Sequence, residues 1–113
     1  MKMMTLDYSQ STNQHWKEIM AEKLKTANTF EIHCWAEETA EISMALSFGT
    51  PKKDSWEYGE IIEGQVTPEF TTFLLSLPKP TDTDLYNKMM PFFTIALDNG
   101  IWYEHYGTEL NVI

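Results

Sequence analysis

The amino-acid sequence predicts an α+β fold, in which three to four helices pack on a small, largely antiparallel sheet that ends in a β-hairpin. Apolar residues recur at helical spacing over 16–27, and apolar and polar residues alternate over 29–35. Two apolar runs also flank an Asp-Asn-Gly turn at 98–100, as in a hairpin. A length of 113 residues is ordinary for one domain. We therefore expect 1–113 to form a single compact domain, with 1–10 as a loose N-terminal end or a short edge strand.

The first helix is predicted directly after Ser11 and Gln14, which have the spacing of a capping box. The apolar residues that follow fall on one helical stripe, and they are Trp16, Ile19, Met20, Leu24 and Ala27. Charged residues occupy the other positions of the segment, so the pattern indicates an amphipathic helix with one buried face.

The segment 29–35 predicts a half-buried strand, because side chains alternate between the two faces of a sheet. One face would carry Phe30, Ile32 and Cys34, so we expect the cysteine to be buried and inert. His33 would lie on the opposite face as a surface residue, away from the thiol.

A second helix is expected immediately after this strand, with Glu37 and Glu38 in its first turn, where the helix dipole favours carboxylates. Ile42 and Leu46 would share its apolar face. Gly49 is a typical residue for the end of such a helix, so residues 50–57 are predicted to form a loop.

The second half of the chain should begin with a strand over 58–66, in which Gly59 and Gly64 indicate a bulge or a close backbone approach. Thr67 then has the character of an N-cap, and Pro68 fits the first position of a helix that ends near Pro78.

The last third of the chain should contain a short fourth helix and the hairpin. The helix is predicted over 82–89, the hairpin strands over 92–97 and 101–106, and a short last strand around 110–112.

The charge of the chain is strongly unbalanced: 17 Asp and Glu face eight Lys and no Arg, for a formal net charge of −9. Nucleic acids and anionic membranes are bound through Lys and Arg, so neither is expected as a partner. The longest apolar stretches are also far shorter than the roughly 20 residues that span a bilayer. A basic protein is the partner that this charge favours.

No motif for catalysis, metal binding or cofactor binding is visible, so no catalytic residue, metal ligand or cofactor is predicted. His15, His33 and His105 do not have the spacing of metal ligands, and the sequence contains neither a phosphate-binding loop nor a nucleophile elbow. The single cysteine and the N-terminal residues, which do not form a signal peptide, favour a cytoplasmic location.

One segment combines carboxylates with large aromatic side chains, and we interpret it as the partner-binding surface. Its residues are Asp54, Trp56, Glu57, Tyr58, Glu60 and Glu63. Trp and Tyr are enriched at binding hot spots, and carboxylates would meet a basic partner there. The alternative is a solvated edge with Trp56 and Tyr58 packed inward; Glu57 and Glu63 would then face outward. The aromatic stretch 102–106 is a second candidate surface.

At the level of a functional class, the chain resembles the small acidic proteins that neutralise basic toxins, such as bacterial immunity proteins. The resemblance rests on size, charge and the missing motifs. It implies a non-enzymatic inhibitor of the immunity or antitoxin type. The alternatives are a small enzyme or small-molecule-binding domain with a pocket of Trp, Tyr and carboxylates, and a subunit of a homo-oligomer.

Overall fold

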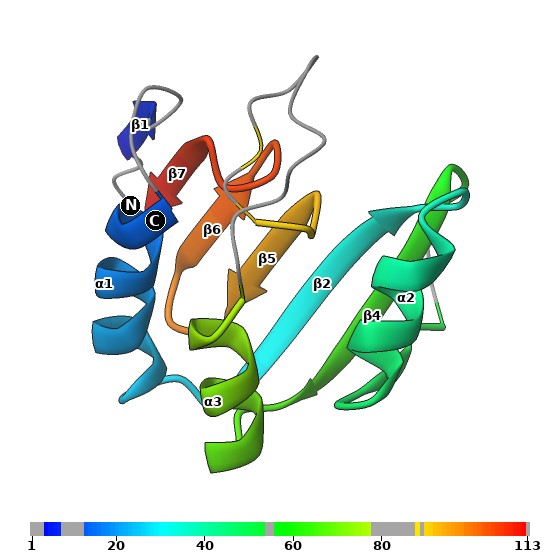
Figure 1. Cartoon of the computed structure of the whole chain (residues 1–113), viewed down its shortest axis with the longest axis horizontal. Coiled ribbons are helices and arrows are strands. Elements are labelled where there is room, and N and C mark those ends of the chain that lie inside the picture. The colour runs from blue at the N-terminus through cyan, green and yellow to red at the C-terminus, as the bar shows by residue number, and fades with distance from the viewer. Residues whose placement is uncertain (1–3, 8–12, 54–55, 78–87, 89, 113) are drawn as a thin grey trace.

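The computed structural model describes residues 4–7, 13–53, 56–77, 88 and 90–112. Ten elements follow one another in these parts of the chain (Figure 1). They are β1 (Met4–Asp7), α1 (Asn13–Leu24), β2 (Thr29–Trp35), α2 (Thr39–Leu46), β3 (Thr50–Pro51), β4 (Gly59–Gln65), α3 (Pro68–Leu75), β5 (Thr94–Leu97), β6 (Ile101–Glu104) and β7 (Glu109–Val112).

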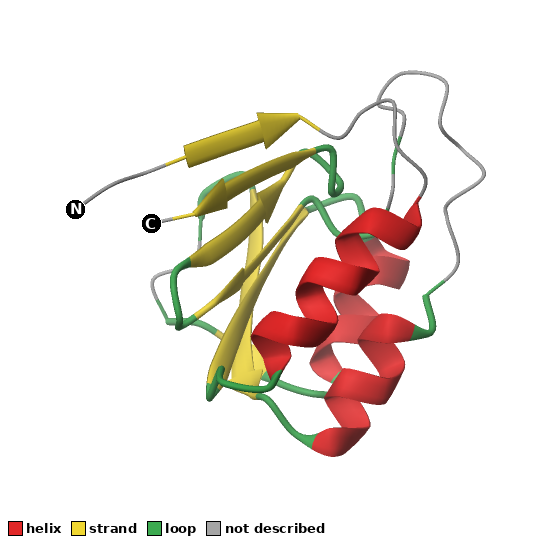
Figure 2. Ribbon diagram, turned by 90° about the vertical axis from the view of Figure 1, so that its left-hand side faces the viewer, coloured by secondary structure: helices red, strands yellow, loops and turns green. Residues whose placement is uncertain are grey.

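The strands form one sheet of seven, in the order β1-β7-β6-β5-β2-β4-β3, and every neighbouring pair is antiparallel. All three helices lie on one side of this sheet, and the other side carries no described helix (Figure 2). We call the latter side the open face. The predicted α+β class is confirmed, with a larger sheet than expected. The predicted fourth helix falls on 82–89, where only Lys88 is described.

The core lies between the helices and the covered side of the sheet. From α1, Trp16, Met20 and Leu24 are buried, as the apolar stripe predicted. From β2 and α3, the Phe30 and Phe70 rings stack with their centroids 3.9 Å apart. Burial of large apolar side chains is the main source of stability in a domain of this size.

The start of α2 differs from the prediction. The helix begins at Thr39, so Glu37 and Glu38 precede it, and the carboxylate in the first turn is that of Glu41. Glu38 is held outside the helix because its carboxylate accepts hydrogen bonds from the Trp35 backbone N–H at 2.8 Å and from the Tyr106 hydroxyl at 2.9 Å.

Two glycines allow β4 to pack closely against its neighbours. A Cβ atom on Gly59 would lie 2.0 Å from the Cys34 carbonyl oxygen, and one on Gly64 would lie 2.6 Å from the Phe48 carbonyl oxygen. The β2–β4 register is unbroken along the whole of both strands, so these glycines mark a close approach and not a bulge. The predicted loop at 50–57 contains the two-residue strand β3, which pairs with β4.

The start of α3 confirms the predicted cap. The Thr67 hydroxyl oxygen accepts a hydrogen bond from the Phe70 backbone N–H at 3.1 Å, and Pro68 occupies the first helical position. Phe70 and Leu74 of this helix are buried, and so is Leu77 just after its end.

Replacing Thr67 with alanine should lower the free energy of unfolding by about 1 kcal/mol, because one backbone N–H at the helix start loses its acceptor. Urea unfolding measures the loss. Thr72→Ala is the matched control, since Thr72 is exposed within the same helix and its replacement leaves the cap intact. Equal stability of the two variants would show that the cap contributes nothing.

The predicted hairpin is present as β5 and β6, with Gly100 at a φ of 93° in the turn. Its strands are shorter than predicted, and the sheet continues beyond it to β7 and β1. β1 pairs with β7 and forms one edge of the sheet. Of the two expectations for residues 1–10, a loose end or a short edge strand, the edge strand is present at Met4–Asp7. None of the helices in the described ranges is long and apolar enough to cross a membrane.

Candidate functional site

The alternation of side chains along β2 separates two surfaces of different chemistry. Phe30, Ile32 and Cys34 are buried under the helices, whereas the residues between them point to the open face and are only half-buried. The thiol and His33 are therefore on opposite faces, as predicted. Burial in the core, with the nearby charges of Glu38 and Glu41, raises the pKa of Cys34 to about 12, so the thiol stays protonated and unreactive at neutral pH.

An aromatic cluster lies at the end of the sheet where β2 finishes and β4 begins. It consists of Trp35, Trp56, Tyr58 and Phe93, and ring centroids are 4.5 Å apart for Trp35 and Trp56 and 5.1 Å apart for Trp35 and Phe93. The Tyr58 ring lies 6.3 Å from that of Trp56. Tyr58 is 60% exposed, so the alternative in which it packs into the core is wrong. It precedes β4 in a turn, where strand alternation does not apply.

The predicted carboxylates divide between two sides of the sheet. Glu57 is exposed in the turn before β4, and Glu60 follows on the helix-covered side, which it shares with Ile62. Glu63 points to the open face and lies opposite Glu31 of β2. Asp54 lies outside the described residues.

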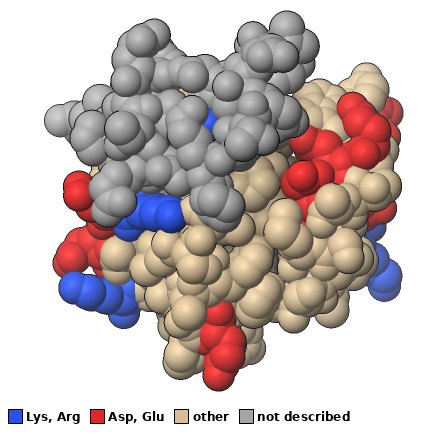
Figure 3. Space-filling view, viewed as in Figure 1, with Lys and Arg blue, Asp and Glu red and all other residues tan. Residues whose placement is uncertain are grey.

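Four of the six predicted residues lie within five positions of one another at the start of β4, and we call this group the acidic end: Trp56, Glu57, Tyr58 and Glu60. Its Trp56 ring packs against Trp35 and His33 on the open face, whereas Glu60 is on the helix-covered side. The backbone N–H of Ala36 donates to the Tyr58 carbonyl at 3.1 Å, which brings Glu37 beside the group. Figure 3 shows carboxylates gathered on the helix-covered side, over the region where α2 and the start of β4 lie. The glutamates just before and within α2 thus extend the same negative surface.

A hollow of about 380 Å³ opens between α2 and β4, beside the acidic end, and we call it the α2–β4 hollow. Its lining residues are Ala36, Ile42, Leu46, Pro51, Glu57, Gly59, Glu60 and Ile62. Among the described residues, neither Glu57 nor Glu60 forms a hydrogen bond or an ion pair with its carboxylate. The hollow thus combines an apolar wall with unbalanced negative charge.

The wall that α2 contributes was not predicted as part of a site. Leu46 was expected to be buried with Ile42, but it is 42% exposed. Helical spacing shows which residues share a face, and it does not show how far a neighbouring strand covers that face.

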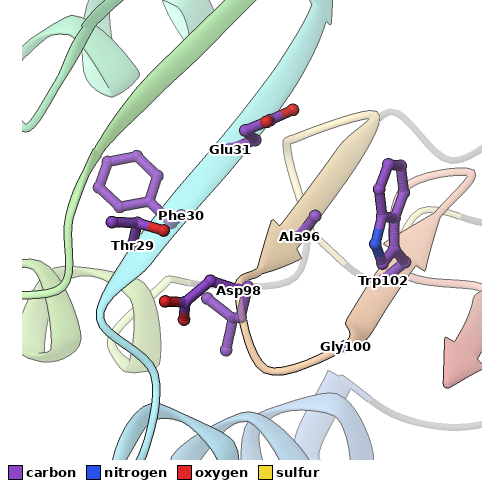
Figure 4. Close-up of a pocket in the computed structure, with 8 residues that line it drawn as sticks. Thr29, Phe30, Glu31, Ala96, Asp98, Gly100 and Trp102 are labelled. Carbon is purple, nitrogen blue, oxygen red and sulfur yellow. The ribbon is translucent and has the colours of Figure 1, made fainter. Parts of the chain in front are cut away.

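A second hollow, of about 270 Å³, lies on the open face. Figure 4 shows Glu31 on β2 and the Trp102 indole on β6 on either side of Ala96, whose small side chain leaves the space between them. The carboxylates of this hollow already have partners. Glu31 is bonded to Lys52 at 2.9 Å and to His33 at 3.2 Å, and Asp98 accepts from the Asn28 backbone N–H at 2.8 Å.

These partners keep both carboxylates ionised. Partial burial alone would raise the pKa of Glu31, but hydrogen bonds from Lys52 and His33 bring it below its usual range. The backbone hydrogen bond from Asn28 lowers the pKa of Asp98. Glu31 therefore ties the loop after β3 to β2, and Asp98 ties the turn between β5 and β6 to the residue before β2. The hollow has little unbalanced charge to offer a ligand.

One group of side chains in the described residues could offer metal ligands: Glu104, His105 and Glu109, whose ligand atoms lie within 4.8 Å of one another. His105 Nδ1 is paired with the Glu109 carboxylate, and Glu104 accepts a hydrogen bond from Asn111 at 3.2 Å. The hydrogen bonds explain the grouping, and proximity is the only observation in favour of a metal.

No known protein family, curated protein or solved structure shows significant similarity to this chain.

Proposed function

We propose that this chain is a non-enzymatic, cytoplasmic protein that binds a basic partner protein, as an inhibitor of the immunity or antitoxin type does. The observation that carries the proposal is the acidic end, where the unbalanced carboxylates of Glu57 and Glu60 line one hollow and Tyr58, between them in the chain, has an exposed ring. An inhibitor of this type needs no chemistry of its own, because it acts by covering the functional surface of its partner.

The charge of the whole chain supports the same conclusion. A net charge of −9 produces a long-range field that accelerates association with a basic protein and disfavours anionic partners. At the acidic end, Tyr58 and Trp56 supply aromatic area of the kind that dominates binding energy at hot spots. Carboxylates alone on a solvated surface contribute less to affinity.

The backbone of the acidic end is held in place on two sides. The Ala36 N–H donates to the Tyr58 carbonyl, and the Gly59 N–H donates to the Trp56 carbonyl at 3.2 Å. A surface that is ordered before binding loses less conformational entropy when the complex forms. The arrangement therefore favours recognition by a rigid surface over folding on contact.

The small-molecule alternative has one point in its favour, the open-face hollow with Trp102, Glu31 and Asp98. Because the two carboxylates there already have partners, we regard this hollow as the weaker candidate. The homo-oligomer alternative is tested by light scattering of the purified chain.

The proposal is tested with a toxin domain encoded immediately upstream of the gene for this chain. Co-expression should restore growth of cells that produce the toxin, and the two purified proteins should bind with an association rate that falls steeply between low salt and about 0.5 M, where charges are screened beyond a few ångströms. A toxin that is neither bound nor inhibited would contradict the proposal, as would a genomic neighbourhood without any toxin gene.

The site within the proposal is tested by charge reversal. Glu57→Lys combined with Glu60→Lys should weaken binding about 100-fold, which corresponds to about 2.7 kcal/mol. Glu18→Lys combined with Glu69→Lys is the matched control, because both residues are exposed, lie outside the predicted surface, and change the net charge equally. Equal losses in both variants would mean that net charge acts without the acidic end. An unchanged affinity in the first variant would exclude this end as the contact surface.

A further inference from the structure

The α2–β4 hollow has an apolar wall that solvent reaches. Ile62 forms its buried part, Ile42 is half-buried, and Leu46 is 42% exposed. Exposed leucine is common on protein surfaces, but here it continues a wall that already lines a hollow. A ligand with an aliphatic portion would remove this apolar surface from water.

The same hollow carries negative charge at Glu57 and Glu60, and α2, which forms its other wall, carries Glu41 in its first turn. Of the lysines in the described ranges, none forms an ion pair with Glu57 or Glu60; Lys52 pairs with Glu31 on the open face. An anionic or purely apolar group in the hollow would displace water from these carboxylates without offering them a hydrogen-bond donor or a positive charge. The lost hydration would reduce the binding free energy of such a group.

We infer that the α2–β4 hollow receives one long cationic side chain, a lysine or an arginine, from the partner protein. The inference rests on the proposed function, and it names the group that this site recognises. Lysine and arginine carry an aliphatic stem that packs on apolar surface while the charged head stays at a polar rim. The stem lies along Ile42, Leu46 and Ile62, and the cation meets Glu57 and Glu60.

The hollow is large enough to admit a long side chain. Its volume of about 380 Å³ is at the small end of the range for ligand sites, about 300–1,000 Å³. Tyr58, which follows Glu57 in the chain, is 60% exposed, so its ring is available to the surface of a bound partner. Insertion would thus anchor the partner at the centre of the acidic end.

The test uses small probes and the complete chain, so it does not depend on the partner. n-Hexylammonium supplies both stem and cation, 1-hexanol supplies the stem alone, and n-hexylguanidinium replaces the ammonium head by the arginine head. NMR titration at low salt follows the methyl resonances of Leu46 and Ile42. Two exposed ion pairs are each worth a few-fold in affinity, so we expect hexylammonium to bind about tenfold more tightly than hexanol. The relative affinity of the two cations then identifies lysine or arginine as the preferred group.

Variants separate the stem from the charge. Glu57→Gln combined with Glu60→Gln should abolish the preference for hexylammonium over hexanol, whereas Leu46→Ser should weaken both probes. Glu18→Gln combined with Glu69→Gln, at exposed positions outside the predicted surface, should leave the preference unchanged. Urea unfolding confirms that each variant is folded, which is expected because the changes are at exposed or half-buried positions.

Equal binding of hexanol and hexylammonium to the unaltered chain would overturn the inference, and so would resonance shifts that centre on the open face. Either result would leave the toxin-binding assay of the proposed function unaffected. Conversely, a chain that binds the probes as expected but no toxin would keep the cation site and remove the proposed function.

Discussion

Replacing Gly59 with alanine is expected to destabilise the domain by about 3 kcal/mol or more, which is large for a change of one methyl group. The added Cβ would lie 2.0 Å from the Cys34 carbonyl oxygen, a backbone atom that cannot rotate away. The neighbouring strands β2 and β4 would have to separate where Trp35 pairs with Gly59. Urea unfolding at neutral pH measures the loss.

Gln65→Ala is the control for this experiment, because Gln65 is exposed at the opposite end of the same strand. Its replacement should change the free energy of unfolding by no more than about 0.5 kcal/mol. If Gly59→Ala were as stable as this control, the close approach of β2 and β4 would not exist. Gly59 also adjoins Tyr58 and Glu60, so the variant should not be used to measure partner binding.

Elements whose signals are local could be predicted from the sequence. The strand at 29–35 has the predicted bounds, because strict alternation with apolar residues on one side is informative by itself. The start of α3 was predicted from Thr67 and Pro68, whose roles depend only on the first turn of the helix. The turn at 98–100 was predicted for the same reason.

Features that depend on distant residues could not be predicted. The start of α2 is set by Glu38, whose carboxylate binds the Tyr106 hydroxyl 68 positions further along the chain. Tyr106 reaches it from a turn in which the φ angle of Tyr106 is 60°, a conformation that is uncommon for residues other than glycine. The position of β2, between β5 and β4, is likewise a property of the complete sheet.

The candidate site shows the same division. Composition indicated Trp56, Glu57, Tyr58 and Glu60, which are neighbours in the chain at the start of β4. The structure packs the Trp56 ring against Trp35 and His33 on the open face and has Glu60 on the helix-covered side. It places Glu63 on the other side of the sheet from Glu60, because their separation by three residues gives them opposite directions along a strand. The wall of the hollow comes from α2, and no sequence pattern connects that helix to the residues after position 56.

The aromatic residues of the cluster should contribute to stability much less than those of the core, and the comparison of two variants tests this. Phe70 is fully buried, and its ring stacks on that of Phe30. Phe70→Ala should therefore cost about 3–5 kcal/mol through lost burial and the cavity that remains. Tyr58→Ala removes a ring that is 60% exposed, and it should change the free energy of unfolding by no more than about 0.5 kcal/mol.

Binding should show the opposite order. Tyr58→Ala is expected to weaken the complex with a basic partner by about tenfold or more, as truncation of an aromatic anchor does. Phe70→Ala, measured at a temperature where it remains folded, should bind normally. A loss of several kcal/mol of stability in Tyr58→Ala would mean that the cluster is a second core. The exposed ring would then be explained by folding alone, and the proposal that this end of the sheet binds a partner would lose its aromatic anchor.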